Sequence, residues 1–551
     1  MSKASDYRVI VSIDFGTTYS GFAYTHIKNK EKEIFTHTDW QDYAGRFKTP
    51  TVLLYDDGLK SVQSWGFSAL AKRPKRKKEK AIDKKPVELF KLHLGNMTNK
   101  PSLPKGLDYK RAITDYLHEF GKIVKIKIND CWKVDFFTQV LLIFTVPAEF
   151  DDKAISIMRE CAYKAGLLKD QFARNLKFMT EPEAAAIHCM KSLKEHNLSV
   201  GANFMVVDCG GGTVDLTTRQ LLKGETLSEI TERSGDYCGG SYVDQEFLKF
   251  LERKVGANAI SQVRENHYGQ LQYMVQEFVR LVKMKFTGDP SEFEDTELEL
   301  DDICPVIKQY CKGEYLDKME EDEWTINLKF DDVKKMFDPI VKKIIRLTDS
   351  QLHLSNNNCS AILMVGGFSE SKYLQSRIKK EFSSKIKLIS IPPQPVIAIV
   401  KGAVEYGFRE EVVSTRVLKW TYGTDVARKW REGDPVNRRL GDGRIIAFER
   451  LVKRGTQVNV NDKVYQSFIS YDATQRRMGL DLYVTPQDDA EFCDDPDVKT
   501  LGNWSVELPD STNDDDRSIL FTMIFGNVEI DVTAYNSGTE AIFDTKFELD
   551  M

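Results

Sequence analysis

The stretch VVDCGGGTVDLTT, residues 206–218, decides how the rest of the chain is interpreted. Its apolar start predicts a buried strand, its three glycines predict a tight turn, and VDLTT predicts a returning strand. Three consecutive glycines are entropically costly, which favours a backbone that closely approaches a ligand. Asp208 at the strand end and Asp215 after the turn are carboxylates that a bound cation would stabilise. The stretch therefore predicts a loop for a phosphate-bearing ligand.

A second hairpin of the same design lies near the N-terminus. Residues 8–14 are mostly Val and Ile and end at Asp14, the turn FGTT follows, and YSGFAYTHI returns as a strand. The two hairpins lie much farther apart in the chain than the period of a solenoid repeat. This separation suits two duplicated α/β lobes that face each other.

A third glycine segment, VGGFSES at residues 365–371, follows an apolar strand at 361–365. It precedes an amphipathic helix at 372–382. Glycines at a helix N-terminus can receive a phosphate or pack against a nucleoside. Apolar spacing also predicts a strand at 140–146 and helices at 151–166, 181–190, 242–255, 271–286 and 396–407.

The pattern of apolar and polar residues changes after about residue 411. Short alternating stretches, including residues 468–470 and 519–525, are separated by Gly, Asp, Asn and Pro. This pattern is typical of a β-sandwich. The predicted domains are therefore an α/β region at 1–410 and a β-rich region at 411–551.

Composition excludes several classes of protein. The net charge of −5 gives no general attraction to nucleic acid or acidic membranes, and the basic run at 72–80 is interpreted as a solvated loop. No apolar run reaches the ~18 residues of a membrane span, and the N-terminus does not predict a secretory leader. The nine dispersed cysteines suit a reducing compartment. A cytoplasmic location is expected, and the nucleus is left open.

These segments resemble motifs of the heat-shock protein 70 (DnaK-type) ATPases, part of the actin-like superfamily. VSIDFGTTYSGFA (11–23) and VVDCGGGTVDLTT are similar to its two phosphate motifs, and ILMVGGFSESKYLQ (362–375) to its adenosine motif. TVPAEF (145–150) and TEPEAAAIH (180–188) are similar to the segments that link its lobes. A divergent branch, the member-12 type, is indicated by WTYG (420–423), DPDVKTLG (495–502) and FGNVEIDVTA (525–534).

The resemblance implies an actin-like (ribonuclease-H-like) fold with lobe I at about 1–203 and 385–410 and lobe II at about 204–384. The implied cofactors are ATP or ADP and Mg²⁺. The implied catalytic residues are Glu181, Asp208 and Asp14, and the implied metal-organising residues are Asp14, Asp208 and Asp215. The implied nucleotide-binding residues are Gly16, Thr17, Thr18, Tyr19, Gly210, Gly211, Gly212, Thr213, Gly239, Gly240, Lys283, Gly366, Gly367 and Phe368.

Two departures from the family pattern affect the functional prediction. The motif around the family's γ-phosphate lysine is not recognisable, so Lys91 in ELFKLHLG is only a candidate, and Glu370 stands where the family has a stacking arginine. Because the sequence stops at Met551 shortly after the last predicted strands, we do not expect the family's helical lid.

The leading prediction is a slow ATPase whose lobes open and close and so modulate partner binding through a lidless β-domain. The expected partners are a protein client or regulator and a nucleotide exchange factor. The alternatives are a nucleotide-binding pseudo-ATPase scaffold and a small-molecule kinase on the same fold, which fold alone does not exclude.

Overall fold

The computed structural model describes residues 7–29, 33–40, 43–70, 85–95, 100–195, 198–224, 226–409, 412–470, 474–508, 517–525, 528–536 and 538–546. The basic run at 72–80 and residues 526–527 of FGNVEIDVTA lie outside this part of the chain. The chain divides into two compact units. The first comprises Met1–Glu149, Arg159–Thr217 and Ser234–Glu410, and the second comprises Phe150–Met158, Thr218–Arg233 and Glu411–Met551.

The first sheet of the first unit contains the FGTT hairpin. Its strands, in spatial order, are β11 (Leu176–Thr180), β10 (Val140–Val146), β1 (Val9–Asp14), β2 (Tyr19–His26) and β3 (Phe35–Thr36), and β6 (Thr49–Pro50) also pairs with β2. Every residue of β1 and β10 is buried, as expected for parallel strands that are covered on both faces. In the antiparallel pairing of β1 with β2, Asp14 lies opposite Gly21.

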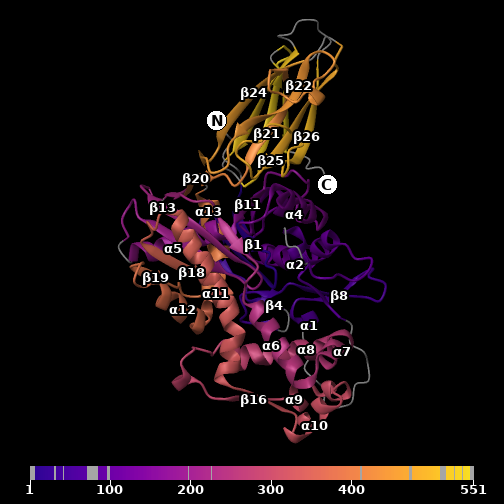
Figure 1. The fold of residues 1–551 in the computed structure, drawn as a ribbon, viewed down its shortest axis with the longest axis vertical. Coiled ribbons are helices and arrows are strands. Elements are labelled where there is room, and N and C mark those ends of the chain that lie inside the picture. Colours follow the sequence, from indigo (N-terminus) through magenta and orange to yellow (C-terminus); the bar gives the residue numbers. More distant parts are fainter. Residues whose placement is uncertain are drawn as a thin grey trace. The chain divides into compact units, whose positions relative to one another are not determined.

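Two helices of the first unit pack together beside β1. These are α5 (Glu181–Glu195) and α13 (Ala398–Phe408) (Figure 1). Ser12 Oγ donates a hydrogen bond of 2.6 Å to the carbonyl of Val400, which joins β1 to α13. A methyl group on Gly402 would lie 1.7 Å from the carbonyl oxygen of Ala184, so glycine permits this close helix contact. The packing places the start of α5, at Glu181, beside the end of the sheet.

The second sheet contains the GGGT hairpin. Within the first unit its strands are β19 (Leu388–Ser390), β18 (Ala361–Val365), β12 (Asn203–Cys209), the start of β13 (Val214–Leu222) and β15 (Ser234–Asp236). β12 runs parallel to β18, with Asp208 opposite Val365. Because the carboxyl ends of parallel strands lie at the same edge of a sheet, the GGGT and GGFS segments emerge side by side.

The first unit contains further helices and short strands. Its longest helices are α2 (Tyr109–Cys131) and α11 (Phe330–Leu354), neither of which was predicted. The predicted helix at 271–286 is divided instead into α8 (Tyr268–Phe278) and a π-helical turn at Val279–Lys283. Besides short 3₁₀ helices, the other described strands and α-helices are β4 (Asp39–Trp40), β5 (Tyr43–Ala44), β7 (Val52–Tyr55), β8 (Val62–Trp65), β9 (Val87–Glu88), β16 (Thr296–Glu299), β17 (Thr325–Leu328), α1 (Phe67–Leu70), α3 (Phe136–Gln139), α6 (Ser241–Val255), α7 (Ala257–Asn266), α9 (Leu300–Ile303), α10 (Glu314–Glu321) and α12 (Lys372–Phe382). Helix α4 (Asp152–Lys164) begins in the second unit and ends in the first.

The second unit is rich in strands. One sheet has the order β22 (Arg444–Val452), β21 (Thr421–Lys429), β25 (Arg477–Thr485) and β26 (Lys499–Glu507). Another has the order β24 (Asp462–Ile469), β27 (Ser518–Phe525), β28 (Asp531–Asn536) and β29 (Ile542–Lys546). In addition, β20 (Val413–Val417) pairs with β14 (Thr226–Glu229) on one side and with β23 (Gln457–Asn459) on the other. Residues of both four-stranded sheets, including Leu482 and Phe521, share one apolar core. Among the described helices, none combines the length and apolar character that crossing a bilayer requires.

Candidate functional site

The two glycine turns lie face to face within the first unit. A methyl group on Gly211 would lie 2.0 Å from Thr18 Oγ1, and one on Gly212 would lie 2.9 Å from Thr17 Cγ2. The FGTT and GGGT turns, far apart in the chain, are therefore in contact. Contact this close leaves no room for a phosphate group between Gly211 and Thr18, so a triphosphate held by both turns requires them to move apart.

Gly239 and Gly240 are hydrogen-bonded to the backbone of the GGGT turn. Gly240 N donates to the carbonyl of Gly210 at 3.0 Å, and Gly239 N donates to that of Gly212 at 3.2 Å. Ser241 N donates to the carbonyl of Gly211 at 2.9 Å. A methyl group on Gly239 would lie 2.4 Å from the carbonyl oxygen of Gly211, so only glycine permits this stacking of two backbones. Residues 239–241 thereby bond to the carbonyl groups of all three glycines of the loop.

Lys283, at the end of the π-helical turn, is hydrogen-bonded to the same glycine pair. Its Nζ donates to the carbonyl of Gly240 and to Asp244 Oδ1, each at 2.7 Å. The structure therefore places Lys283 behind the loop, with its ammonium group bonded to protein atoms. A methyl group on Gly240 would lie 3.1 Å from the ring of Phe368, which packs on the same glycine pair.

The third glycine segment borders Asp208. Gly366 has a φ of +83°, and a methyl group there would lie 2.3 Å from Asp208 Oδ1. Its neighbour Gly367 is less confined, since a methyl group would meet only Val396, at 3.8 Å. The backbone at Gly366 therefore lies against the Asp208 carboxyl group. Glycine permits this because it has no side chain and adopts a positive φ readily.

The remaining predicted residues of the FGTT turn are fixed by neighbouring groups. Thr51 Oγ1 donates to the carbonyl of Gly16, and Thr51 N donates to that of Thr18, each at 2.8 Å. Burial, together with the charge of Asp244, raises the pKa of Tyr19 to about 12, so this phenol remains protonated at neutral pH. In the facing turn, Gly210 N donates to the carbonyl of Thr213 at 3.0 Å.

Buried carboxyl groups gather around the two turns. Asp14, Glu181, Asp208 and Asp215 are all buried. Burial, followed by repulsion from neighbouring carboxylates, raises the pKa values of Asp208 and Asp215 well above their ordinary values. Burial raises the pKa of Glu181 to about 7, although Lys91 opposes this shift. Ionising all of these neighbouring buried carboxyl groups is unfavourable. Clusters of carboxyl groups with strongly shifted pKa values occur most often at functional sites.

Several oxygen atoms of this cluster are suited to a cation. Asp208 Oδ1, Asp215 Oδ2, Glu149 Oε2 and Thr180 Oγ1 are buried without a hydrogen-bond partner. Carboxylate and hydroxyl oxygens are the ligands that a hard divalent cation such as Mg²⁺ prefers, so the residues fit this ion. No three acidic, His or Cys side chains within the described ranges converge closely enough to hold a bare ion. A cation would therefore rely on its water shell.

Two lysines face the carboxyl cluster. Lys91, the candidate from the sequence, donates from Nζ to Glu181 Oε1 at 3.0 Å, with both side chains buried. Lys48, which was not predicted, donates from Nζ to Asp14 Oδ2 at 2.5 Å. Glu149 was also not predicted, although it lies in the quoted segment TVPAEF. Two carboxylates of the cluster, Asp14 and Glu181, are therefore each paired with a lysine.

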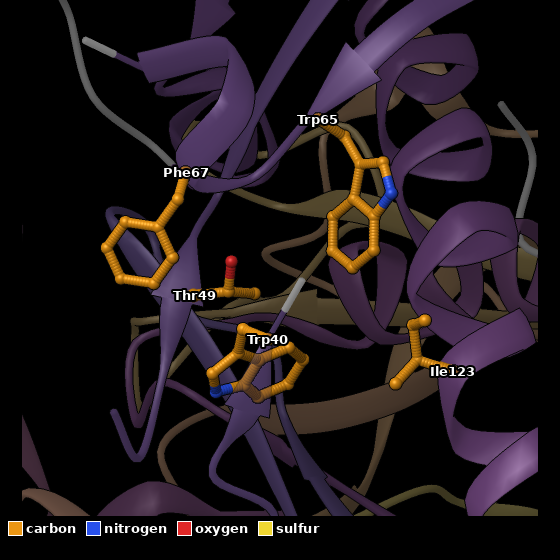
Figure 2. Close-up of a pocket in the computed structure, with 5 residues that line it drawn as sticks. All are labelled: Trp40, Thr49, Trp65, Phe67 and Ile123. Carbon is orange, nitrogen blue, oxygen red and sulfur yellow. The ribbon is translucent and has the colours of Figure 1, made fainter. Parts of the chain in front are cut away.

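Neither Cys209 nor the hollow in Figure 2 supplies the chemistry of the site. Cys209 is fully buried, and burial raises the pKa of its thiol, which disfavours a reactive thiolate. Figure 2 shows a separate hollow lined by Trp40, Thr49, Trp65, Phe67 and Ile123. This lining has one hydroxyl and no charged group, so it lacks what a triphosphate needs.

Comparison with known proteins agrees with this geometry. The family model of Hsp70 protein matches residues 138–429, more than half of the chain, so the chain belongs to the HSP70 family. Its mixed α/β architecture fits an actin-like ATPase fold. Members of the family generally bind ATP or ADP with Mg²⁺, and membership points to ATP binding, chaperone-like function and protein partners.

Within the family, the chain is similar over nearly its whole length to the divergent member-12 branch. It is 27% identical to "Heat shock 70 kDa protein 12A" of Mus musculus, with 98% of this chain and 91% of the relative covered. It is 26% identical to "Heat shock 70 kDa protein 12B" of Homo sapiens, with 98% and 90% covered. "Chaperone protein HscA" of Buchnera aphidicola subsp. Baizongia pistaciae is 23% identical, with 72% and 69% covered.

Proposed function

We propose that this protein binds magnesium-ATP between the FGTT and GGGT turns and hydrolyses it slowly. The observation that carries the proposal is the direct contact of Gly211 with Thr18 amid buried carboxylates that have unsatisfied oxygens. Glycine turns offer backbone N–H groups to phosphates, and the carboxylates offer a place for the cation. No other cluster of the described residues combines both features.

Each side chain has a proposed role in this reaction. Asp14, Asp208 and Asp215 hold the water shell of magnesium, and Glu181 positions the attacking water. When bound, magnesium neutralises charge on the phosphates that develops during phosphoryl transfer. Residues 16–19 and 210–213 grip the phosphates, whereas Gly366, Gly367 and Phe368 lie along the adenosine. Gly239, Gly240 and Lys283 act by holding the second phosphate loop in place, as their hydrogen bonds suggest.

ATP binding is proposed to be coupled to lobe opening. The lobes are residues 1–203 with 385–410 and residues 204–384. Because the turns touch, a triphosphate enters only when the lobes separate, and it then bridges the two turns. A ligand that binds one arrangement better shifts the population toward it by its difference in affinity. Hydrolysis removes one bridging phosphate and so changes that preference.

The β-rich region at 411–551 is proposed to bind a protein partner without a helical lid. Between β20 and β29, the described residues include strands and a short 3₁₀ helix at Val436–Arg438 but no α-helix, which supports a β-sandwich. Nucleotide state would alter partner affinity, and an exchange factor would accelerate nucleotide release. A cytoplasmic location is proposed, with the nucleus left open.

Calorimetric titration with magnesium-ATP tests the proposal. We expect Asp208→Ala and Asp14→Ala each to weaken binding at least about tenfold, because each removes a charged group that interacts with the ion. Glu119→Gln is the matched control, since Glu119 belongs to a surface ion pair with Lys122 at 2.7 Å. Unchanged affinity in both aspartate variants would refute the site.

A further inference from the structure

One contact between the two proposed lobes lies away from the glycine turns. Glu88, at the end of β9, belongs to lobe I, and Tyr268, the first residue of α8, belongs to lobe II. The phenol of Tyr268 donates a hydrogen bond to Glu88 Oε1. Gln272, one turn further along α8, donates from Nε2 to the Tyr268 oxygen at 2.8 Å. A chain of hydrogen bonds therefore runs from α8 to a strand of lobe I.

An ion pair lies beside this hydrogen bond. Lys85 Nζ lies 3.3 Å from Glu265 Oε1, and the two side chains are 42% and 61% exposed. A pair so open to solvent contributes little, because water and salt screen its charges. Lys85 Nζ also lies 5.8 Å from the centre of the Tyr268 ring, and Tyr268 itself is 3% exposed. The hydrogen bond of the buried phenol is therefore the stronger part of the contact.

Glu88 is anchored in lobe I by its strand. β9 pairs with β7, with Glu88 opposite Val52 and Val87 opposite Leu53. Val52, Leu53 and Val87 are all buried, so the backbone that carries Glu88 is part of a packed region. Separating the lobes therefore breaks the hydrogen bond to Tyr268, because Glu88 cannot follow α8.

The lobe contact changes how readily Glu88 binds a proton. Burial raises the pKa of Glu88 to about 7, although Lys85 and Arg264 of α7 oppose this shift. Other titratable groups near Glu88 are Glu265, which pairs with Lys85, and the phenols of Tyr268 and Tyr19. In separated lobes water surrounds the carboxyl group, and its pKa returns toward the ordinary value of 4.5. The resulting stabilisation of the closed lobes is complete below about pH 4.5 and is lost as pH rises through 7.

We propose that the Glu88–Tyr268 contact is a proton-dependent clasp on the closed lobes and that it controls how fast bound nucleotide leaves. This inference rests on the proposed function, because release of the nucleotide requires the lobes to separate. The clasp lies away from the glycine turns, so it stays formed while the turns part to hold the phosphates. Release is therefore slow in acid and faster in base, through groups that do not touch the nucleotide.

Release of ADP that carries a fluorescent N-methylanthraniloyl group tests this inference. The full chain, loaded with this ligand in magnesium, is mixed with excess unlabelled ADP at pH 6 and at pH 8. We expect the wild-type release rate to rise about tenfold from pH 6 to pH 8. Glu88→Gln keeps a hydrogen-bond acceptor but cannot ionise, so it should release the ligand slowly at both pH values. Comparing these two proteins with one ligand cancels the titration of groups that they share.

Tyr268→Phe tests the hydrogen bond itself. Removing the phenol oxygen should speed release about tenfold at pH 8, where Glu88 is ionised and the bond to it is charge-assisted. Tyr55→Phe is the matched control, because Tyr55 Oη donates to Asp115 Oδ2 at 2.8 Å within lobe I. This control removes a phenol–carboxylate bond that does not cross between lobes, and both release rates should stay unchanged.

A second measurement needs no nucleotide. Hydrogen–deuterium exchange of the nucleotide-free protein compares wild type with Glu88→Gln at each pH, so the intrinsic pH dependence of exchange is the same for both. We expect peptides from residues 85–95 and 266–278 to be equally protected in the two proteins at pH 6. At pH 8 these peptides should be less protected in wild type, because ionised Glu88 weakens the clasp.

The outcomes separate this inference from the proposed function. If wild type binds no nucleotide but exchange differs as expected, the proposed function fails together with the control of release, whereas the proton-dependent contact stands. If wild type and Glu88→Gln release nucleotide with the same pH dependence, the clasp is refuted and the proposed function stands.

Discussion

Replacing Gly239 with alanine should disable the site without touching a nucleotide-binding side chain. The added methyl group would lie 2.4 Å from the carbonyl oxygen of Gly211, 2.5 Å from its carbonyl carbon and 2.7 Å from the carbonyl oxygen of Gly210. All three atoms belong to the backbone, so no side chain can rotate away. The GGGT turn has to move by roughly an ångström to restore ordinary carbon–oxygen contacts.

The magnitude follows from the contacts that such a shift breaks. Three backbone hydrogen bonds join residues 239–241 to the turn, at 3.2, 3.0 and 2.9 Å. Each contributes about 1 kcal/mol net, so a shift that breaks all three costs about 3 kcal/mol, whereas a turn that stays in place keeps the bonds and is overpacked at a cost of about 1–3 kcal/mol. Either way, the native loop geometry becomes unfavourable by up to about 3 kcal/mol. Because ATP binding has to restore that geometry, we expect its affinity to fall about a hundredfold.

The assay is calorimetric titration with magnesium-ATP, with circular dichroism to verify that the variant is folded. Gly58→Ala is the matched control in the same unit, since a methyl group there would meet only the flexible Lys60 side chain, at 3.5 Å, and Asp56. A Gly239→Ala variant that binds magnesium-ATP within about threefold of wild type would show that the glycine pair does not shape the phosphate loop.

Two further predictions concern α5. Because burial raises the pKa of Glu181 to about 7, its stabilising contribution is complete below the unfolded pKa near 4.5 and is lost as pH rises through 7. Between about pH 5.5 and pH 8, nucleotide-free protein should lose about 2 kcal/mol through this group, and Glu181→Gln should remove that part of the pH dependence in urea titrations. Gly402→Ala should lower the melting temperature far more than Gly58→Ala does, because its methyl group would lie 1.7 Å from the Ala184 carbonyl and force α13 away from α5. An unchanged melting temperature would contradict this packing.

Local signals were sufficient where neighbouring residues determine the structure. The predicted strands at 140–146 and 361–365 and the helix at 372–382 have the bounds of β10, β18 and α12. Helix α2 was not predicted, although its sequence carries a helical signal: its buried residues recur at three- and four-residue intervals. The predicted strand at 468–470 is the end of the longer β24, Asp462–Ile469, whose alternating exposed residues weaken its apolar signal.

The repetition of one motif predicted that the two turns face each other, and the structure brings them into direct contact. The ion pair of Lys48 with Asp14 had no comparable local signal. Lysine before Thr-Pro is ordinary in sequence, and it reaches Asp14 only because β6 pairs with β2 at the register that places Gly21 beneath it. Glu149 likewise becomes part of the carboxyl cluster through its position beside Asp215 and Gly235.

The sequence by itself therefore determined the family, the two phosphate-type hairpins and most of the acidic residues around them. These depend on strand propensity, glycine turns and strand-end carboxylates, which are properties of short segments. Only the tertiary structure decided which cation each carboxylate receives and whether the two turns touch. Strand register and the approach of distant backbones set those distances, and no single segment contains that information.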